Sequence, residues 1–315
     1  MLLLLLLAPG LLAQETVLIT AGFNGGVKDS CELLDSSCLI PSLPWNPATN
    51  RSARSDHIAA RTGDGVLLTC GGEAPDGTDD LSCYALDLTA DAWVPHSVLD
   101  RPRIKATAVS SPAFGILILG GFKEESSSHL MTGATEWIAG PTLPSADYFG
   151  ICSVLLSDTS FLVIGGRPEG ALGGTRVQEI RQAASGAWEQ ESWPDLYVDR
   201  WGHACARLGD QVIVAGGVSP FFTMYSSTTV FDLNTREQRE AGEMFEQRTW
   251  FGMAVVQGRL LAFGGMGPYY KNAWGQVEEW QEEEEEWLLR EETMPVAKSS
   301  FASLLVTPEE ICRNM

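Results

Sequence analysis

A short, mostly apolar segment that ends in a pair of small residues recurs six times along the chain. The pair is Gly-Gly in five copies and Ala-Gly in the first. The copies are 45–51 residues apart, and their second glycines are Gly22, Gly72, Gly121, Gly166, Gly217 and Gly265. Apolar runs without polar alternation are typical of strands buried on both faces, and a glycine pair favours a sharp exit where a side chain would collide with a neighbour. The repeat therefore predicts an all-β fold built from six similar units.

Each repeat has strand signals on both sides of the glycine-pair segment. A strand-like segment precedes it across a tight turn such as 63–65, and a polar loop and a third strand follow it. A fourth strand starts at a tryptophan in several repeats, at Trp93, Trp137, Trp188 and Trp287. Four strands in a period near 50 residues predict the blade of a β-propeller.

The two ends of the chain are incomplete in complementary ways. The first glycine-pair strand, at 17–21, has no strand signal before it, and the chain ends with a segment at 300–306 that matches the strand missing there. We expect residues 300–306 to lie beside 17–21, so that the C-terminal strand closes a ring of six four-stranded blades and leaves no open sheet edge. Residues 14–315 are then one propeller domain.

The chain resembles the kelch-repeat family in its apolar strand, glycine pair, spaced aromatic residue and later tryptophan. The resemblance covers about residues 15–308 and departs at Ala21-Gly22 and at the missing late tryptophan of copies one and five. It implies a six-bladed kelch-type β-propeller. It says little about function, because this architecture hosts many roles.

The N-terminus predicts entry into the secretory pathway. The apolar stretch from Leu2 to Leu12 is too short to span a bilayer and suits a signal peptide over residues 1–13, with a buried strand or helix as the alternative. Asn50 begins an Asn-Arg-Ser glycosylation site, and the chain has 7 cysteines, as a secreted protein can. We therefore expect a secreted glycoprotein.

The cysteines sort by their place in the repeat. Cys70 and Cys83 should face each other across a hairpin, and Cys31 and Cys38 lie within the outer hairpin of the first unit, so two disulfides are predicted. Cys152 and Cys205 fall on successive inner strands, where we expect burial as small apolar groups instead of a bond. Cys312 is left unassigned.

The charge balance excludes several function classes. With 21 Lys and Arg against 41 Asp and Glu, the net charge of −20 argues against a protein that binds nucleic acid or an anionic membrane. No nucleophile elbow, P-loop or zinc-ligand spacing occurs, so we expect no metal and no cofactor. His57 and His203 are interpreted as inner-strand histidines bonded to backbone, and the acidic run 282–286 as a solvated hairpin tip.

A basic side chain stands just before the inner strand of five of the six repeats, with Ala146 as the exception. The five are Arg54, Arg103, Arg200, Arg248 and Lys298. Propeller symmetry would place them around the axis, and the kelch resemblance implies a mouth that binds carboxylates or acidic peptides. The alternative is that these side chains tie adjacent blades by donating to backbone carbonyls.

The sequence thus predicts a secreted, monomeric binding module with a protein or peptide partner that remains unidentified. The alternative is a propeller enzyme, either a copper oxidase similar to galactose oxidase or a lyase. Metal content and titratable groups at the axis would separate the two classes.

Overall fold

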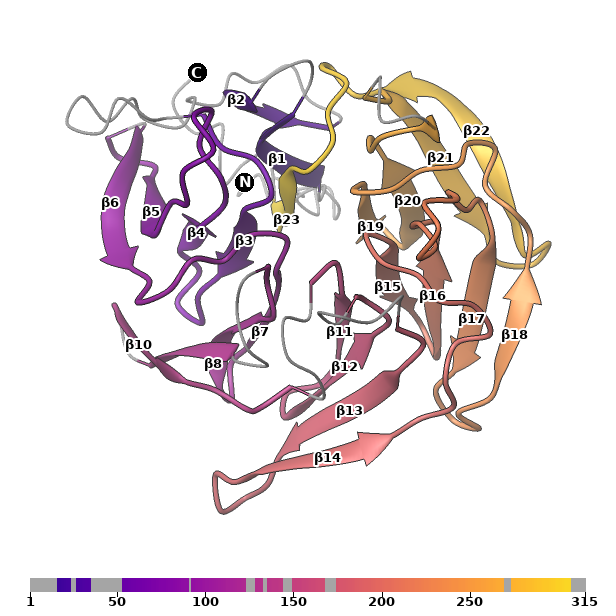
Figure 1. Cartoon of the computed structure of the whole chain (residues 1–315), viewed down its shortest axis with the longest axis horizontal. Coiled ribbons are helices and arrows are strands. Elements are labelled where there is room, and N and C mark those ends of the chain that lie inside the picture. Colours follow the sequence, from indigo (N-terminus) through magenta and orange to yellow (C-terminus); the bar gives the residue numbers. More distant parts are fainter. Residues whose placement is uncertain are drawn as a thin grey trace, which may run out of the picture.

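The computed structural model describes residues 16–23, 27–34, 53–90, 92–122, 128–132, 135–143, 149–167, 174–268 and 273–306. Within these ranges every named element is a β-strand, and the strands form antiparallel sheets arranged around a common axis (Figure 1). The predicted all-β propeller with four-stranded sheets is therefore confirmed.

Five of the described sheets have four strands each, numbered here from sheet 2 to sheet 6. Sheet 2 contains β3 (Ile58–Arg61), β4 (Leu67–Cys70), β5 (Ser82–Asp87) and β6 (Ala92–Val98). Sheet 3 contains β7 (Thr107–Ser111), β8 (Gly115–Leu119), β9 (Ser128–Thr132) and β10 (Glu136–Ala139). Sheet 4 contains β11 (Cys152–Ser157), β12 (Ser160–Ile164), β13 (Val177–Gln182) and β14 (Trp188–Ser192). Sheet 5 contains β15 (Ala204–Leu208), β16 (Gln211–Ala215), β17 (Thr228–Asp232) and β18 (Gln238–Ala241). Sheet 6 contains β19 (Gly252–Val256), β20 (Arg259–Phe263), β21 (Gln276–Gln281) and β22 (Glu286–Thr293).

Sheet 1 contains the first and the last described strands. Its described strands are β2 (Val27–Leu33), β1 (Thr16–Phe23) and β23 (Ala302–Val306), in that order. The β1–β23 register runs from Thr16 opposite Val306 to Thr20 opposite Ala302. This is the pairing expected between 17–21 and 300–306, and it brings the first and last described strands into one sheet (Figure 1).

The core lies between neighbouring sheets. The second strand of each four-stranded sheet has both faces covered, which explains why these segments are apolar without alternation. One cluster packs Leu162 and Ile164 of sheet 4 against Val212 and Val214 of sheet 5. The outer tryptophans also link sheets, since the Trp287 indole donates a 2.9 Å hydrogen bond to the Thr228 hydroxyl of sheet 5.

The glycine pairs are required by close approach and by backbone conformation. Gly71 and Gly216 have φ of +69° and +64°, a region that residues with a Cβ rarely adopt. A Cβ on Gly71 would lie 2.7 Å from the Arg103 carbonyl oxygen of the next sheet, and one on Gly216 would lie 2.6 Å from that of Arg248. The predicted collision with a neighbouring unit is therefore real.

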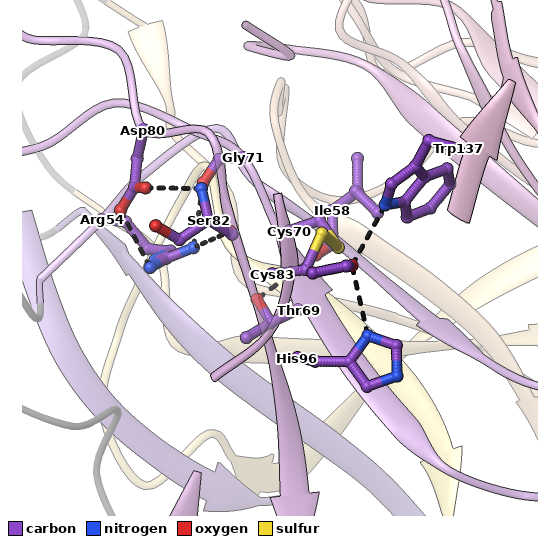
Figure 2. Close-up of a disulfide and its surroundings, with 11 residues drawn as sticks. Arg54, Ile58, Thr69, Cys70, Gly71, Asp80, Ser82, Cys83, His96 and Trp137 are labelled. Atoms are coloured by element: carbon purple, nitrogen blue, oxygen red, sulfur yellow. Dashed lines mark hydrogen bonds and ion pairs between the residues drawn. A yellow bond between two sulfur atoms is a disulfide. The ribbon is translucent and has the colours of Figure 1, made fainter. Parts of the chain in front are cut away.

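The disulfide predicted between Cys70 and Cys83 is present across β4 and β5, with the Cα atoms 4.1 Å apart (Figure 2). The prediction for Cys152 and Cys205 is wrong, because these residues form a second disulfide. They lie on β11 and β15, the innermost strands of adjacent sheets. These strands converge toward the axis, so the two Cα atoms are only 6.0 Å apart, within the range that a disulfide spans.

Several predictions concern residues outside the described ranges: the signal peptide at 1–13, Asn50, Cys312, and Cys38 as the partner of Cys31. Cys31 itself is buried on β2. The described part of the chain holds no helix with the length and apolar character needed to cross a bilayer.

Candidate functional site at the axis

The five predicted basic residues are buried, with 0–1% of each residue exposed. Four of them are arginines whose Nη1 donates to the carbonyl of the first glycine of the pair in the same sheet. The bonds are Arg54 to Gly71 at 3.2 Å, Arg103 to Gly120 at 2.7 Å, Arg200 to Gly216 at 3.0 Å and Arg248 to Gly264 at 3.0 Å. Figure 2 shows Arg54 beside Gly71 and Ser82.

The backbone of the same residues links neighbouring sheets. Each basic residue accepts, through its own carbonyl, the N–H of the second glycine of the preceding sheet. The donors are Gly22 to Arg54, Gly72 to Arg103, Gly166 to Arg200, Gly217 to Arg248 and Gly265 to Lys298, at 2.8–2.9 Å. Side chain and carbonyl together join a glycine turn of one sheet to that of the sheet before it.

This geometry argues against the predicted carboxylate-binding role of Arg54, Arg103, Arg200, Arg248 and Lys298. Their charged groups are covered by protein and face inward, so a ligand at the mouth would not reach them. It supports the alternative interpretation, in which they hold the sheets together, with one refinement. The arginine side chains bond within their own sheet, and the link to the preceding sheet runs through the main chain.

The buried arginines are stabilised in different ways. Arg54 forms an ion pair with Asp80 at 2.9 Å, and Arg248 forms one with the fully buried Glu278. Arg200 instead lies with its guanidinium carbon 5.4 Å from the centre of the Tyr225 ring and bonds the Ser227 hydroxyl. Burial lowers the pKa of Arg200 to about 10, so this side chain stays charged at neutral pH.

The repeat position that lacks a basic residue is 148, not the predicted Ala146. Phe149 forms a β-bridge with Arg167 in sheet 4, as Ser55 does with Glu73 in sheet 2. The residue equivalent to Arg54 is therefore the one before Phe149, which is Tyr148 in the sequence. Residues 146 and 148 both lie outside the described ranges.

Two residues after each of these positions, the backbone forms a closed ring of hydrogen bonds around the axis. Each N–H donates to the carbonyl of the equivalent residue in the preceding sheet. The bonds are Asp56 to Ser300, Lys105 to Asp56, Gly150 to Lys105, Gly202 to Gly150, Trp250 to Gly202 and Ser300 to Trp250, at 2.8–3.0 Å. All six residues have left-handed φ between 52° and 63°. We call this set the axial ring.

The side chains of the axial ring differ strongly from one another. Trp250 lies over the two glycines: a Cβ on Gly150 would be 3.1 Å from the indole Cη2, and one on Gly202 would be 3.0 Å from Cε2. The Lys105 ammonium lies 5.4 Å from the centre of the Trp250 ring, a cation–π distance. The axial ring therefore carries an aromatic side chain over its glycines in sheets 4 and 5, and the polar side chains of Asp56, Lys105 and Ser300 at its other positions.

A cavity of about 290 Å³ lies at the axis, lined by the axial ring and the start of the innermost strands. Asp56 is one of the lining residues, and its Oδ1 is buried without a hydrogen-bond partner. Burial raises the pKa of its carboxyl group, and the Lys105 charge opposes the rise. Cys152 and Cys205 also line this cavity. The arrangement offers an ammonium, a carboxyl group and an indole to a small group that enters from the mouth.

The two inner-strand histidines are buried, at 5% and 6% exposure. The Nε2 of His57 is 2.9 Å from the Thr20 hydroxyl, so this imidazole bonds a side chain of sheet 1 where a backbone partner was predicted. Burial and the Arg200 charge lower the pKa of His203 to about 3. Among the described residues, no group of three or more His, Cys, Asp or Glu is placed to hold a metal ion.

The axial ring was missed by sequence reasoning, which stopped at the basic residue two positions earlier. Its six members share a backbone conformation and no side-chain type. The available signal was the fixed offset from the basic residue, with glycine at two of the six positions.

Comparisons with known proteins define the class of fold. No known protein family and no curated protein matches the sequence. The solved structure of YjhT, a propeller, is similar with a TM-score of 0.68 at 12% sequence identity, over 86% of this chain and 96% of that one. The similarity shows that the chain is a β-propeller, the class that its sheets and axial ring already define.

Proposed function

We propose that this chain is a secreted, kelch-type propeller with six blades in a closed ring, and that it acts as a monomeric binding module. The closed ring is supported by the β1–β23 pairing and by the axial ring, which passes through a residue of every sheet. Secretion is supported by the two disulfides, which persist in oxidising compartments. The proposal of a kelch-type propeller rests on the repeated apolar strand, glycine pair and later tryptophan in the sequence.

The ligand we propose is a carboxylate-bearing molecule or acidic segment that binds at the axial mouth. Lys105 carries this proposal: it is half-buried, stacked on Trp250 beside the axial cavity, and no described carboxylate forms an ion pair with it. The Lys105 charge also acts on the Asp56 carboxyl group, whose pKa burial raises, and the ammonium can donate a charge-assisted hydrogen bond to a carboxylate of a ligand. In this proposal Lys105 binds the carboxylate, in place of the five buried basic residues.

A lyase-like activity is the second candidate. A carboxyl group with a raised pKa next to a lysine, at the edge of a cavity, is an arrangement that can serve general acid–base chemistry. If the site is an enzyme, Asp56→Asn should abolish turnover of a bound ligand. In a binding module the same change leaves the ligand intact and alters only its affinity.

The test is binding of a fluorescein-labelled oligoglutamate peptide to the mature chain, followed by fluorescence anisotropy at low and high salt. We expect Lys105→Gln to weaken binding about tenfold or more, because a charge-assisted hydrogen bond contributes roughly 1.5–3 kcal/mol. We also expect the affinity of the unmutated chain to fall as salt rises.

The matched control is Arg290→Gln on the outer strand β22. It removes the same charge from a residue bound to Glu292 and Glu279, far from the mouth. If both variants lost the same binding affinity, the effect would come from net charge alone and the proposal would be contradicted. Failure of the peptide to bind the unmutated chain would also contradict it.

A further inference from the structure

Aromatic side chains from sheets 3, 4 and 5 form a continuous line beside the axial mouth. The ring centres of Phe122 and Phe149 are 5.3 Å apart, those of Phe149 and Trp201 are 5.7 Å apart, and those of Trp201 and Phe222 are 6.2 Å apart. Phe149 and Trp201 are buried, whereas Phe122 is 44% and Phe222 is 58% exposed. Phe221, the neighbour of Phe222, is 79% exposed. We call these five residues and Arg167 the aromatic surface.

The two most exposed phenylalanines, Phe221 and Phe222, lie in a hydrogen-bonded turn. The Ser219 hydroxyl accepts the N–H of Phe221 and of Thr223, at 3.2 and 3.0 Å, and the Ser219 N–H donates to the Thr223 carbonyl at 2.8 Å. On either side of the turn, Val218 and Met224 form a β-bridge and are buried. These bonds fix the backbone from which both rings project, which lowers the backbone entropy lost on docking.

Phe222 has a left-handed backbone, with φ of 63°. This conformation costs a bulky residue free energy, and it persists where the surrounding hydrogen bonds impose it, often at sites of function. Here the Phe222 N–H donates to the Ser219 carbonyl at 2.9 Å. Glycine would adopt the same backbone conformation without strain. Phenylalanine at this position therefore lowers the stability of the fold, and a role of its ring in binding would explain why it is there.

Arg167 supplies the charge of this surface. Its guanidinium carbon lies 5.7 Å from the centre of the Trp201 ring, and its backbone is fixed by the bridge to Phe149. Among the described residues no carboxylate forms an ion pair with Arg167, in a chain whose net charge is −20. Within the described part of the chain, the surface thus offers a cation without a carboxylate partner next to exposed aromatic rings.

We infer that the aromatic surface docks an acidic peptide segment of a protein partner, with a bulky apolar side chain against Phe221 and Phe222 and a carboxylate on Arg167. Aromatic and arginine side chains are the residues that most often dominate binding energy at protein interfaces. The partner must bring the carboxylate, because no described residue pairs one with Arg167. The inference does not depend on the ligand of the axial mouth.

The test selects a phage-displayed library of random dodecapeptides on the immobilised full chain. We expect enriched peptides to carry Asp or Glu within a few residues of Leu, Ile, Phe or Trp. The most enriched peptide is then synthesised and titrated against variants by calorimetry. Phe221→Ser and Arg167→Gln should each weaken it at least tenfold, whereas Phe245→Ser, which alters a phenylalanine that is 61% exposed outside the aromatic surface, should change it less than twofold.

Phe222→Gly separates binding from folding. Because glycine adopts the left-handed backbone without strain, this variant should fold with an undiminished melting temperature and still lose the peptide. No enrichment, enriched peptides without an acidic residue, or full affinity in Phe222→Gly would each overturn the inference. Phe221-dependent binding to phosphatidylcholine vesicles in place of peptides would overturn it as well, since it would assign the surface to a membrane.

Discussion

The buried basic residues show what a residue-level pattern can and cannot predict. Their recurrence at a fixed place before each inner strand was readable from the sequence, and so was their position near the axis. The direction in which their side chains point could not be predicted from the sequence. The left-handed glycine turns leave carbonyls that face inward, and a buried carbonyl needs a donor, so the long side chains turn toward the protein instead of the mouth.

Replacing Arg200 with alanine should destabilise the fold. The buried Gly216 carbonyl would lose its donor, and the Ser227 carbonyl would keep only the Gly216 N–H, so we expect the free energy of unfolding to fall by about 3 kcal/mol. Lys105→Gln, at the half-buried axial mouth, should change it by less than about 0.5 kcal/mol. Urea denaturation of both variants measures this, and a reversed order would return the arginines to the binding role.

His203 should make the protein sensitive to acid. Its pKa is about 3 in the folded chain and 6.5 when unfolded, so the unfolded state binds the proton first and stability falls as pH drops below about 6.5 toward 3. One such group contributes a slope of at most about 1.4 kcal/mol per pH unit. The variant His203→Leu should lose less stability between pH 7 and 4 than the unmutated chain does. Identical pH profiles would contradict this account.

At the scale of elements, the strands were predictable and the axial ring was not. Strands with both faces covered have a composition that the sequence displays, and the period of the repeat fixes their number per sheet. The axial ring depends on main-chain hydrogen bonds between residues of successive repeats and between Asp56 and Ser300. Its non-glycine members Asp56, Lys105, Trp250 and Ser300 carry no sign of a left-handed backbone. The close approach of β11 and β15 was hidden for the same reason, since it follows from convergence at the axis.

A glycine of the pair should not tolerate a methyl group. In Gly217→Ala the new Cβ would lie 2.8 Å from the His203 Cβ and 3.0 Å from the Trp201 carbonyl, at a φ of +91°. The conformation alone costs about 1–3 kcal/mol, and the contacts add to it. Gly63→Ala is the control, because a Cβ there meets nothing within 4 Å. Thermal unfolding should separate the two variants clearly, and equal melting temperatures would contradict the close-packing argument.

The two disulfides should differ in their contribution to stability. Cys152 and Cys205 are 53 residues apart and close a longer loop than Cys70 and Cys83, which are 13 apart. Loop entropy alone predicts losses of about 4 and about 3 kcal/mol when each pair is replaced by serine. Denaturation of the two double variants tests this order, and mass analysis of the non-reduced protein confirms both bonds beforehand. An inverted order would mean that native-state contacts outweigh loop entropy.

For the whole molecule, the last described strand and the residues just before it contact both sheet 1 and sheet 6. Ser300 completes the axial ring, Lys298 accepts from Gly265 of sheet 6, and β23 covers the edge of β1. Of these contacts, only the pairing of β23 with β1 was anticipated, from the unpaired strand signals at 17–21 and 300–306, because an open ring would leave sheet edges exposed. The sequence could not predict which side chains meet at the axial mouth, because Asp56, Lys105 and Trp250 belong to different repeats and come together only in the folded chain.

Removing the closing strand should therefore disrupt more than one sheet. A chain that ends at 297 loses Lys298, Ser300 and β23, so sheets 1 and 6 lose their connection and the axial ring loses two of its hydrogen bonds. We expect this truncation to lack a cooperative thermal transition. A circular permutant that joins Val306 to Thr16 through a short Asn-Gly turn, with new ends in the exposed turn at 63–65, keeps every strand and should melt cooperatively. A truncated chain that melts like the intact one, or a permutant that does not fold, would show that the ends of this propeller do not close it.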